Sequence, residues 1–261
     1  MPAIDPSIVE STLLCEDCGY VIESVGEGGV CPECGRPVAD SLPSRRTGTP
    51  YQSHPGIRTW LGTLLVTIRH PVGVWGTVVI GGGTDNKLLF TTLIAAAIGV
   101  MLPPAALVSL LIPGGIVLVV LFAGPLSVMA ITLVLYWLTR IEEWGIGYFG
   151  SRRGWRLTPA VARTITAHAA VGWLAAALLF WPLMLLNLMY QPSKLVRPGV
   201  GAIWPLALDV LRSVLPFLGA FIGLLMFEVL VYIGMRRCRF ANQQAAPTLD
   251  PALQRLGVRR A

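Results

Sequence analysis

Four of the five cysteines in this sequence stand in two copies of one short motif, Cys-x-x-Cys-Gly, at residues 15–19 and 31–35. Two cysteines at this spacing can place both thiolates on one metal ion if the chain turns tightly after them, and the following glycine permits such a turn. Four thiolates complete a closed tetrahedral site with no position left for catalysis, so we expect one structural zinc ion. Two disulfides, unrelated free thiols or an iron centre of the rubredoxin kind are the alternatives. The expected metal ligands are Cys15, Cys18, Cys31 and Cys34.

The segment around these cysteines, residues 10–40, has too few apolar residues to fold around a core of its own. Metal binding must therefore supply much of its folding free energy. The segment is also acidic, because Arg36 stands against seven acidic residues, Glu10, Glu16, Asp17, Glu23, Glu27, Glu33 and Asp40. Nucleic acid phosphates would repel such a surface. We predict that this zinc ribbon has a protein partner and does not bind nucleic acid.

The cysteine motifs and their surroundings resemble those of a known group of proteins. Cys-x-x-Cys-Gly-Tyr, followed by Cys-Pro-Glu-Cys-Gly-Arg-Pro, a Ser/Arg/Gly/Pro segment and a multi-span apolar region, is similar to the bacterial zinc-ribbon membrane proteins. Some of these join the ribbon to a Yip1-like domain. The motif match covers residues 15–37, and the Yip1-like comparison rests on layout, since that family usually has five spans.

Residues 88–138 contain no Asp, Glu, Lys, Arg or His. As one helix this stretch would be roughly 75 Å long, more than twice the thickness of a hydrocarbon core of about 30 Å, so it must fold back once. A turn at Pro103-Pro104 would leave the first half too short to span. We therefore predict a kink at Pro103-Pro104 and a hairpin at Pro113 to Gly115, which gives transmembrane helices at about 88–112 and 116–138.

Two further apolar stretches, at about residues 164–190 and 213–235, predict a third and a fourth span. The membrane domain then covers residues 88–239, and a basic C-terminal tail follows at 240–261. The composition agrees, with 54% hydrophobic and only 13% charged residues. The predicted fold class is an α-helical integral membrane protein with four transmembrane helices, or five if residues 72–80 also cross, and a small N-terminal zinc ribbon.

Between the ribbon and the spans the sequence predicts two segments. Residues 41–56 are rich in Ser, Pro, Arg, Gly and Thr without periodicity, which is typical of a flexible linker. Residues 57–80 begin with an amphipathic helix that is too short to span, so we expect it on the bilayer surface or packed on the protein's own spans. Residues 72–80 are expected to be interfacial or re-entrant. The apolar stripe of the helix is Ile57, Trp60, Leu61, Leu64, Leu65 and Ile68.

The basic residues predict the orientation in the membrane. With four spans, seventeen of the twenty Lys and Arg residues fall on one side, since only Lys194, Arg197 and Arg212 lie on the other. The positive-inside rule makes the richer side cytoplasmic. The N-terminus lacks the features of a cleavable signal, and zinc thiolate sites persist best in a reducing compartment. We expect a multi-pass protein of the cell (inner) membrane with both termini in the cytoplasm.

Two ionisable residues lie within the expected spans, His168 and Glu228. Both are placed near the cytoplasmic face, so they form a candidate intramembrane polar pair joined by a hydrogen bond. The alternative is that Glu228 is protonated and bonds locally, or reaches toward water. Cys238 lies beside the last span, where a cysteine can be acylated or remain an inert thiol.

The sequence shows no constellation typical of an enzyme: it lacks a His-Glu-x-x-His motif, a nucleophile elbow and a P-loop. We therefore expect a non-enzymatic membrane protein whose cytosolic zinc ribbon docks a protein partner at the bilayer. A small transporter or channel component that uses His168 and Glu228 is the alternative.

Overall fold

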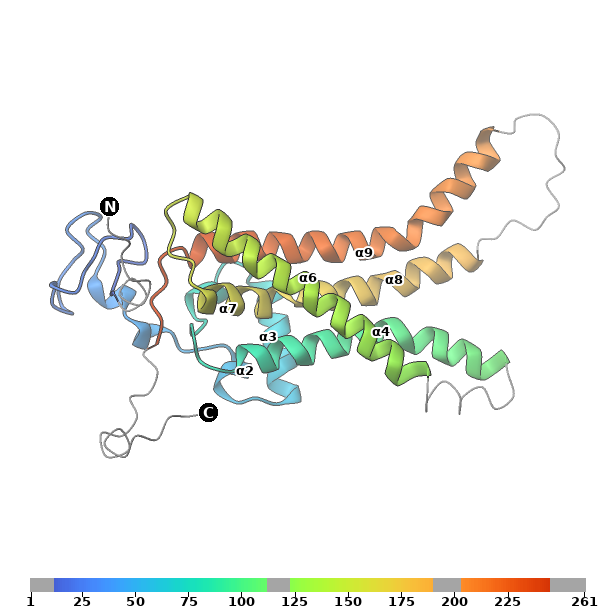
Figure 1. The fold of residues 1–261 in the computed structure, drawn as a ribbon, viewed down its shortest axis with the longest axis horizontal. Helices are drawn as coiled ribbons and strands as arrows, with labels where there is room; N and C mark the ends of the chain where they lie inside the picture. Colours follow the sequence, from blue (N-terminus) through green and yellow to red (C-terminus); the bar gives the residue numbers. More distant parts are fainter. Residues whose placement is uncertain (1–11, 112–122, 190–202, 245–261) are drawn as a thin grey trace.

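The computed structural model describes residues 12–111, 123–189 and 203–244 (Figure 1). In these ranges the regular elements are helical, and the N-terminal segment adds two isolated antiparallel β-bridges, Leu14 with Val21 and Val30 with Pro37. We call residues 12–40 the cysteine module, and α4 to α9 the helix bundle. The elements in chain order are η1 (Val38–Ser41), η2 (Pro43–Arg45), α2 (Pro50–Ser53), α3 (Ile57–Arg69), η3 (Val74–Gly76), α4 (Asp85–Leu111), α6 (Gly124–Arg152), α7 (Pro159–Ala169), α8 (Val171–Met189) and α9 (Ile203–Arg237).

Four helical stretches are long and apolar enough to cross a membrane, which confirms the expected number of apolar helices within the described residues. They are Asp85–Leu102, Gly124–Arg152, Pro159–Met184 and Phe217–Arg237. Their outer faces are apolar: α4, for example, exposes Phe90, Ile94, Ile98 and Leu102 at four-residue steps. A soluble protein would present polar side chains there. The exterior suits hydrocarbon, as in a multi-pass membrane protein.

The helices differ from the expected spans mainly at their ends. Helix α4 continues through Pro103-Pro104 as far as Leu111, while the expected hairpin at Pro113 to Gly115 lies outside the described residues. Helix α6 runs well past residue 138, to Arg152, and accommodates charged residues there: Arg140 pairs with Glu143, which also accepts a hydrogen bond from Thr166 of α7. The third stretch is two helices, α7 and α8, which meet at Ala170. Of the basic tail, residues 245–261 lie outside the described part.

Helices α8 and α9 pack backbone to backbone through small residues. A Cβ atom added to Gly223 of α9 would lie 2.3 Å from the Cβ of Ala176, and one added to Gly172 of α8 would lie 2.6 Å from the Cβ of Phe227. Such separations are far below van der Waals contact, so these positions accept only glycine without movement. Small residues allow apolar helices to approach closely enough to gain dispersion energy where water supplies no driving force.

The prediction of a flexible linker at residues 41–56 is wrong. Arg46, which is 6% exposed, donates from Nη1 to the backbone oxygens of Trp75 and Val78, both at 2.9 Å, and its guanidinium pairs with Glu16. Thr49 caps α2 together with Gln52 in a capping box. The polar composition of the segment resembles that of a linker, but its Arg46 side chain supplies hydrogen bonds to buried backbone carbonyl groups. These carbonyl groups lie about thirty residues farther along the chain. The cysteine module is therefore joined to the bundle by ordered chain.

Helix α3 turns most of its apolar stripe outward, while Leu64 and Trp60 of that stripe face the core. Its inner face carries Thr63, Leu64 and Thr67, which are buried, while the outer face consists of Ile57, Leu61, Leu65 and Ile68, which are exposed. The Thr63 hydroxyl accepts a hydrogen bond from the backbone N–H of Tyr51 at 2.9 Å. Residues 72–80 form no helix of membrane-spanning length, and Val74, Trp75, Val78 and Ile80 are buried in the protein core. The loop of residues 72–80 is therefore part of the protein core. The outer apolar face of α3 has no partner among the described residues.

Candidate metal centre and its attachment to the helix bundle

The two cysteine motifs fold into the same local structure. In each, the backbone N–H of the glycine bonds to the carbonyl oxygen of the first cysteine at 2.9 Å, in Gly19 to Cys15 and in Gly35 to Cys31. Both glycines have positive φ, 81° and 73°, a conformation that other residues adopt only with strain. The N–H of each first cysteine then bonds back across the turn, at 2.8 Å. The repeated motif therefore encodes two equivalent turns that each present a pair of thiols.

The four thiols converge on one point. Their sulfur atoms all lie within 4.8 Å of one another, and the Sγ atoms of Cys15 and Cys34, like those of Cys18 and Cys31, are 3.6 Å apart. A tetrahedral metal–thiolate centre with bonds of about 2.3 Å places its sulfurs roughly 3.8 Å apart. A disulfide would bring two sulfurs to about 2.05 Å. The cysteines are free, so the geometry fits a single metal ion and not two disulfides.

The backbone prepares one ligand for metal binding. Burial opposes ionisation of the Cys15 thiol, but backbone N–H groups of Cys18 and Asp17 point at its sulfur and lower its pKa to about 7. A thiolate is the form that binds metal, so the turn favours the binding form before a metal arrives. Cys15 and Cys31 are buried, whereas Cys18 and Cys34 face outward. The site is closed toward the protein and lies just beneath the module surface.

The module is attached to the bundle by the segment after α9. Asn242, which is 3% exposed, accepts a hydrogen bond from the backbone N–H of Leu14 at 3.0 Å and donates to the Leu14 and Ser41 carbonyl oxygens, both at 2.7 Å. Arg156, in the turn between α6 and α7, donates to the same Asn242 side chain and to the Ala241 carbonyl. Figure 1 shows this module, in dark blue, at the end of the bundle where α9 ends. One side chain thus ties the start of the chain to its last described residues.

Several of the module's acidic residues are neutralised by arginines of the same chain. Glu16 pairs with Arg46 at 2.9 Å, and Asp17 lies 3.6 Å from Arg239 and 3.9 Å from Arg36. Asp40 pairs with Arg36 and Arg45. In the described residues, three acidic side chains of the module are exposed without such a pair, Glu23, Glu27 and Glu33. The acidic surface expected from the sequence is therefore partly used to hold the module in place.

The structure does not bring His168 and Glu228 together. His168 is buried, with Nδ1 2.9 Å from the Thr164 carbonyl oxygen and Nε2 3.3 Å from the Thr49 hydroxyl. Both ring nitrogens are therefore occupied, while Glu228 is exposed on α9. The depth of a residue along a helix follows from counting, but its direction around the helix depends on packing, and this is where the predicted pair fails.

A buried acidic residue was missed by the sequence reasoning. Asp85, at the first turn of α4, is 4% exposed; it accepts a hydrogen bond from the Thr164 hydroxyl at 2.5 Å and one from the Gln52 amide at 3.3 Å. Together with His168 and Thr49 these side chains form a buried polar cluster that joins α2, α4 and α7. Its position at the start of an apolar helix is the one sign of it in the sequence, because an acidic side chain is stabilised by the helix dipole at the N-terminus.

Cys238 lies outside the metal centre and is fully buried. Its sulfur is 3.9 Å from the Trp75 carbonyl oxygen, and burial raises the pKa of the thiol to about 11. Acylation requires an accessible thiol with some thiolate character. The structure therefore favours the inert thiol over the acylated one.

Comparison with known proteins gives no relative from which a role could be inferred: no family model, no curated protein and no solved structure matches the chain. The class of the protein is defined by its own features. It is an all-helical chain in its described residues, apart from two isolated bridges, with four helices able to cross a membrane and a four-cysteine metal centre at its N-terminal end.

Proposed function

We propose that the chain is a non-enzymatic, multi-pass protein of the cell (inner) membrane whose cytosolic zinc ribbon docks a protein partner at the bilayer. The observation that carries this proposal is the fixed attachment of a four-cysteine module to one end of an apolar bundle. A module held in this way presents its outer face at a set height above the membrane. In this reading the chain is related to the zinc-ribbon membrane proteins that its motifs resemble.

Zinc is the metal that best suits this site. Four thiolates in a closed tetrahedron are typical of structural zinc, and they leave no open position for a substrate or water. The core of the module consists of Cys15, Ile22, Cys31 and Val38, with Leu13, Val25 and Leu42 packed against it. So small a core needs a metal to fold, which assigns the ion a structural role.

The level of the membrane surface is indicated by contacts on three helices. Trp60 of α3 donates to Thr92 of α4 at 3.0 Å, and Phe90 of α4 stacks on Tyr136 of α6 with ring centroids 5.3 Å apart. The outward apolar stripe of α3 would lie in the bilayer surface at this level. From Thr92 to Leu111, α4 then has about 30 Å of helix, the thickness of a hydrocarbon core. The module, the ends of α6 and α9 and their arginines lie on the cytosolic side, in accord with the positive-inside rule.

The module exposes apolar and acidic side chains that a partner can contact. Tyr20, Val21 and Val30 are 41%, 48% and 56% exposed, and the unpaired Glu27 and Glu33 lie in the same module. Exposed apolar side chains rimmed by charge are typical of protein interaction sites. The exposed acidic residues of the same module favour a protein over nucleic acid.

A site-specific crosslinking experiment tests the docking proposal. A photoreactive amino acid in place of Val30 should yield a discrete protein adduct in intact membranes, and Cys31→Ser in the same chain should abolish it because the surface unfolds. The matched control replaces Leu61 on α3, an equally exposed apolar residue that faces lipid in this proposal. No adduct from the Val30 position, or an adduct that persists with Cys31→Ser, would refute docking by the folded module.

Reporter fusions test the orientation independently. A reporter after Ala261 should be cytoplasmic and one inserted near Ser193 should be outside, because seventeen of the twenty basic residues lie on the first side. A cytoplasmic reporter near Ser193 would overturn the four-span arrangement.

A small transporter or channel component is the second candidate. It is favoured by one observation, the burial of Asp85 and His168 in one polar cluster between α2, α4 and α7, since buried ionisable groups are candidates for a functional site. Glu228 has no part in that cluster. Proton-coupled solute uptake into proteoliposomes that is lost with Asp85→Asn would establish this function, and a folded protein without such uptake would exclude it for the solutes tried.

A further inference from the structure

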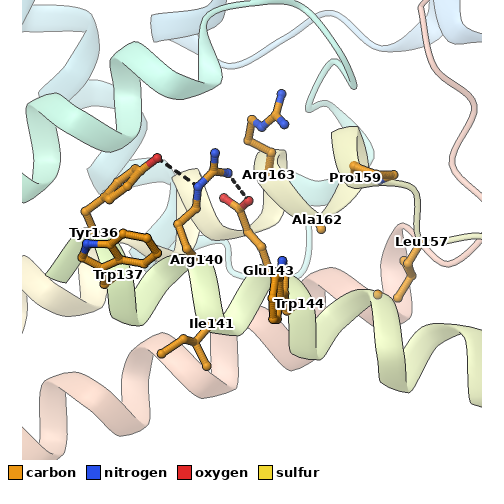
Figure 2. A pocket seen from close by; sticks show the side chains of 11 residues that line it. Tyr136, Trp137, Arg140, Ile141, Glu143, Trp144, Leu157, Pro159, Ala162 and Arg163 are labelled. Carbon is orange, nitrogen blue, oxygen red and sulfur yellow. Dashed lines mark hydrogen bonds and ion pairs between the residues drawn. The ribbon is translucent and has the colours of Figure 1, made fainter. Parts of the chain in front are cut away.

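A groove of about 770 Å³ lies between the later turns of α6 and the first turns of α7 (Figure 2). Its α6 wall carries Trp137, Ile141 and Trp144, which are 60%, 64% and 84% exposed. Its α7 wall carries Ala162 and Arg163. The groove is therefore open along an apolar side and has polar groups at its inner end.

The charges in the groove do not cancel. Arg140 forms an ion pair with Glu143, drawn in Figure 2, and also donates from Nε to the Tyr136 hydroxyl at 3.0 Å. The second carboxylate oxygen of Glu143 accepts a hydrogen bond from Thr166 at 3.1 Å. Both carboxylate oxygens of Glu143 therefore have partners, and its negative charge offsets the charge of one of the two arginines that line the groove.

The second arginine, Arg163, has no acidic partner among the described residues. Its Nε atom is shielded from solvent and no hydrogen-bond acceptor in the described chain reaches it. Burial of a guanidinium nitrogen without an acceptor costs free energy, because the donor loses its hydrogen bonds to water and forms none with the protein. The groove therefore carries a net charge of one positive unit, and the charge of Arg163 has no acidic counterpart among the described residues.

The height of the groove matches a lipid headgroup. Tyr136 stacks on Phe90 at the level where α3 would lie in the bilayer surface, and Arg140 follows one helical turn farther toward the module. Below this level the exposed face of α6 continues with Leu133 and Met129. An amphiphile with its head in the groove would find an apolar path for its chains along the same helix.

We propose that this groove binds the phosphate group of an anionic phospholipid, which Arg163 and Arg140 contact while the acyl chains run down the exposed face of α6. The inference rests on the proposed insertion of the bundle in a membrane. A phosphodiester carries one negative charge, which complements the single excess positive charge of the groove, and its oxygens accept hydrogen bonds from guanidinium groups. Basic pockets between helices at the cytosolic side are suited to such headgroups. The tryptophans at the mouth of the groove suit the same interface.

Native mass spectrometry of the purified full chain in detergent tests the proposal. Phosphatidylglycerol should bind in preference to phosphatidylethanolamine, and Arg163→Gln should weaken phosphatidylglycerol binding about fivefold, the change expected for one basic residue at an anionic surface. Arg152→Gln is the matched control, because Arg152 is an exposed arginine at the end of α6, the other helix that forms the groove, and does not itself line the groove. Equal binding of the two lipids by the wild type, or an unchanged affinity in Arg163→Gln, would overturn the site.

A second variant decides the matter if Arg163→Gln does not fold. Glu143→Gln removes the charge that offsets Arg140, so it should tighten phosphatidylglycerol binding; an unchanged or weaker affinity counts against the site. Extraction of the same membranes at alkaline pH reports insertion separately. Loss of lipid preference in an inserted protein refutes the groove alone, whereas a wild-type chain that is not retained in the membrane refutes the proposed function as well.

Discussion

The core of the cysteine module is four buried side chains, two of which are the candidate metal ligands Cys15 and Cys31, whereas the core of the helix bundle runs through α4, α7, α8 and α9 and also includes Tyr51 of α2. The module is ordered by turns, thiols and ion pairs with the rest of the chain. The bundle is ordered by close helix contacts such as those of Gly223 and Gly172. The difference shows how one chain can stabilise two regions in different surroundings. The module relies on a metal because it buries few side chains, and the bundle relies on close helix packing because water supplies no driving force within a bilayer.

Removal of the metal should have the largest effect, and it should be confined to the module. Cys31→Ser deletes one ligand, and structural zinc supplies on the order of 10 kcal/mol of apparent folding free energy in small modules. We expect loss of zinc by elemental analysis and full amide exchange over residues 12–40, while the four apolar helices stay protected. Cys238→Ser is the control, since that thiol is buried away from the cluster and should leave one zinc per chain. Unchanged protection in the zinc-free module would contradict its dependence on metal.

Arg46→Ala should have the next largest effect and should reach both regions. Its side chain joins Glu16 of the module to two backbone oxygens in residues 74–78, so truncation leaves a carboxylate and two carbonyls without their partner. Breaking a buried ion pair in this way costs about 3–5 kcal/mol. The neighbouring Arg45 is exposed, and Arg45→Ala should cost at most about 1 kcal/mol. Thermal unfolding in detergent compares the two, and equal midpoints would show that the connection does not stabilise the protein.

Gly223→Ala should destabilise the bundle without touching the module. The added methyl group would meet Ala176 at 2.3 Å and force α8 and α9 apart, at a cost of about 1–3 kcal/mol. Gly147→Ala on α6 is the matched control, because nothing lies within 4 Å of its added Cβ and alanine is the better helix former. The control should be neutral or slightly stabilising in the same unfolding assay. A loss of zinc from Gly223→Ala would show that the two regions are more tightly coupled than proposed.

The smallest effect is expected at alkaline pH, from Cys238 between the two regions. Burial raises its pKa from 9.0 to about 11, so the folded state prefers the neutral thiol. The contribution of Cys238 to the free energy of unfolding is complete below the pKa of the unfolded state and is lost as the pH rises toward the pKa of the folded state. The loss amounts to about 1 kcal/mol by pH 10. Cys238→Ala should therefore lose less stability than the wild type between pH 8 and pH 10. Parallel curves for the two proteins would contradict a buried, neutral thiol.

The features that the sequence predicted correctly depend on neighbours along the chain. The spacing of Cys15 and Cys18, and of Cys31 and Cys34, requires only a local turn, and the apolar helices follow from composition over twenty residues. The features that it missed depend on distant partners. Arg46 and Thr49 look like linker residues until the loop before α4 and helix α7 are placed around them.

The failed pairing of His168 with Glu228 has a related cause. Counting residues gives the position of each side chain along its helix axis, because the rise per residue is fixed. The rotation of α7 and α9 about their axes depends on tertiary packing, which local sequence patterns do not encode. Asp85 was overlooked because it lies at the edge of the apolar run, where an acidic residue is ordinary. Its burial becomes visible only when Thr164 and Gln52 are brought to it.

The bond between Leu14 and Asn242 has a consequence for biosynthesis. These residues are 228 positions apart, so the module emerges from the ribosome long before the segment on which it is held. At about 5–20 residues per second, synthesis of the intervening chain takes roughly 10 to 50 s. During that interval the module can capture its metal and close, but the Asn242 side chain that holds Leu14 and Ser41 has not yet been made. Its docking on Asn242 therefore follows the synthesis of α9, and a chain truncated within α9 would keep the Arg46 contacts of its module without those of Asn242 and would expose the module more readily to quality-control proteases.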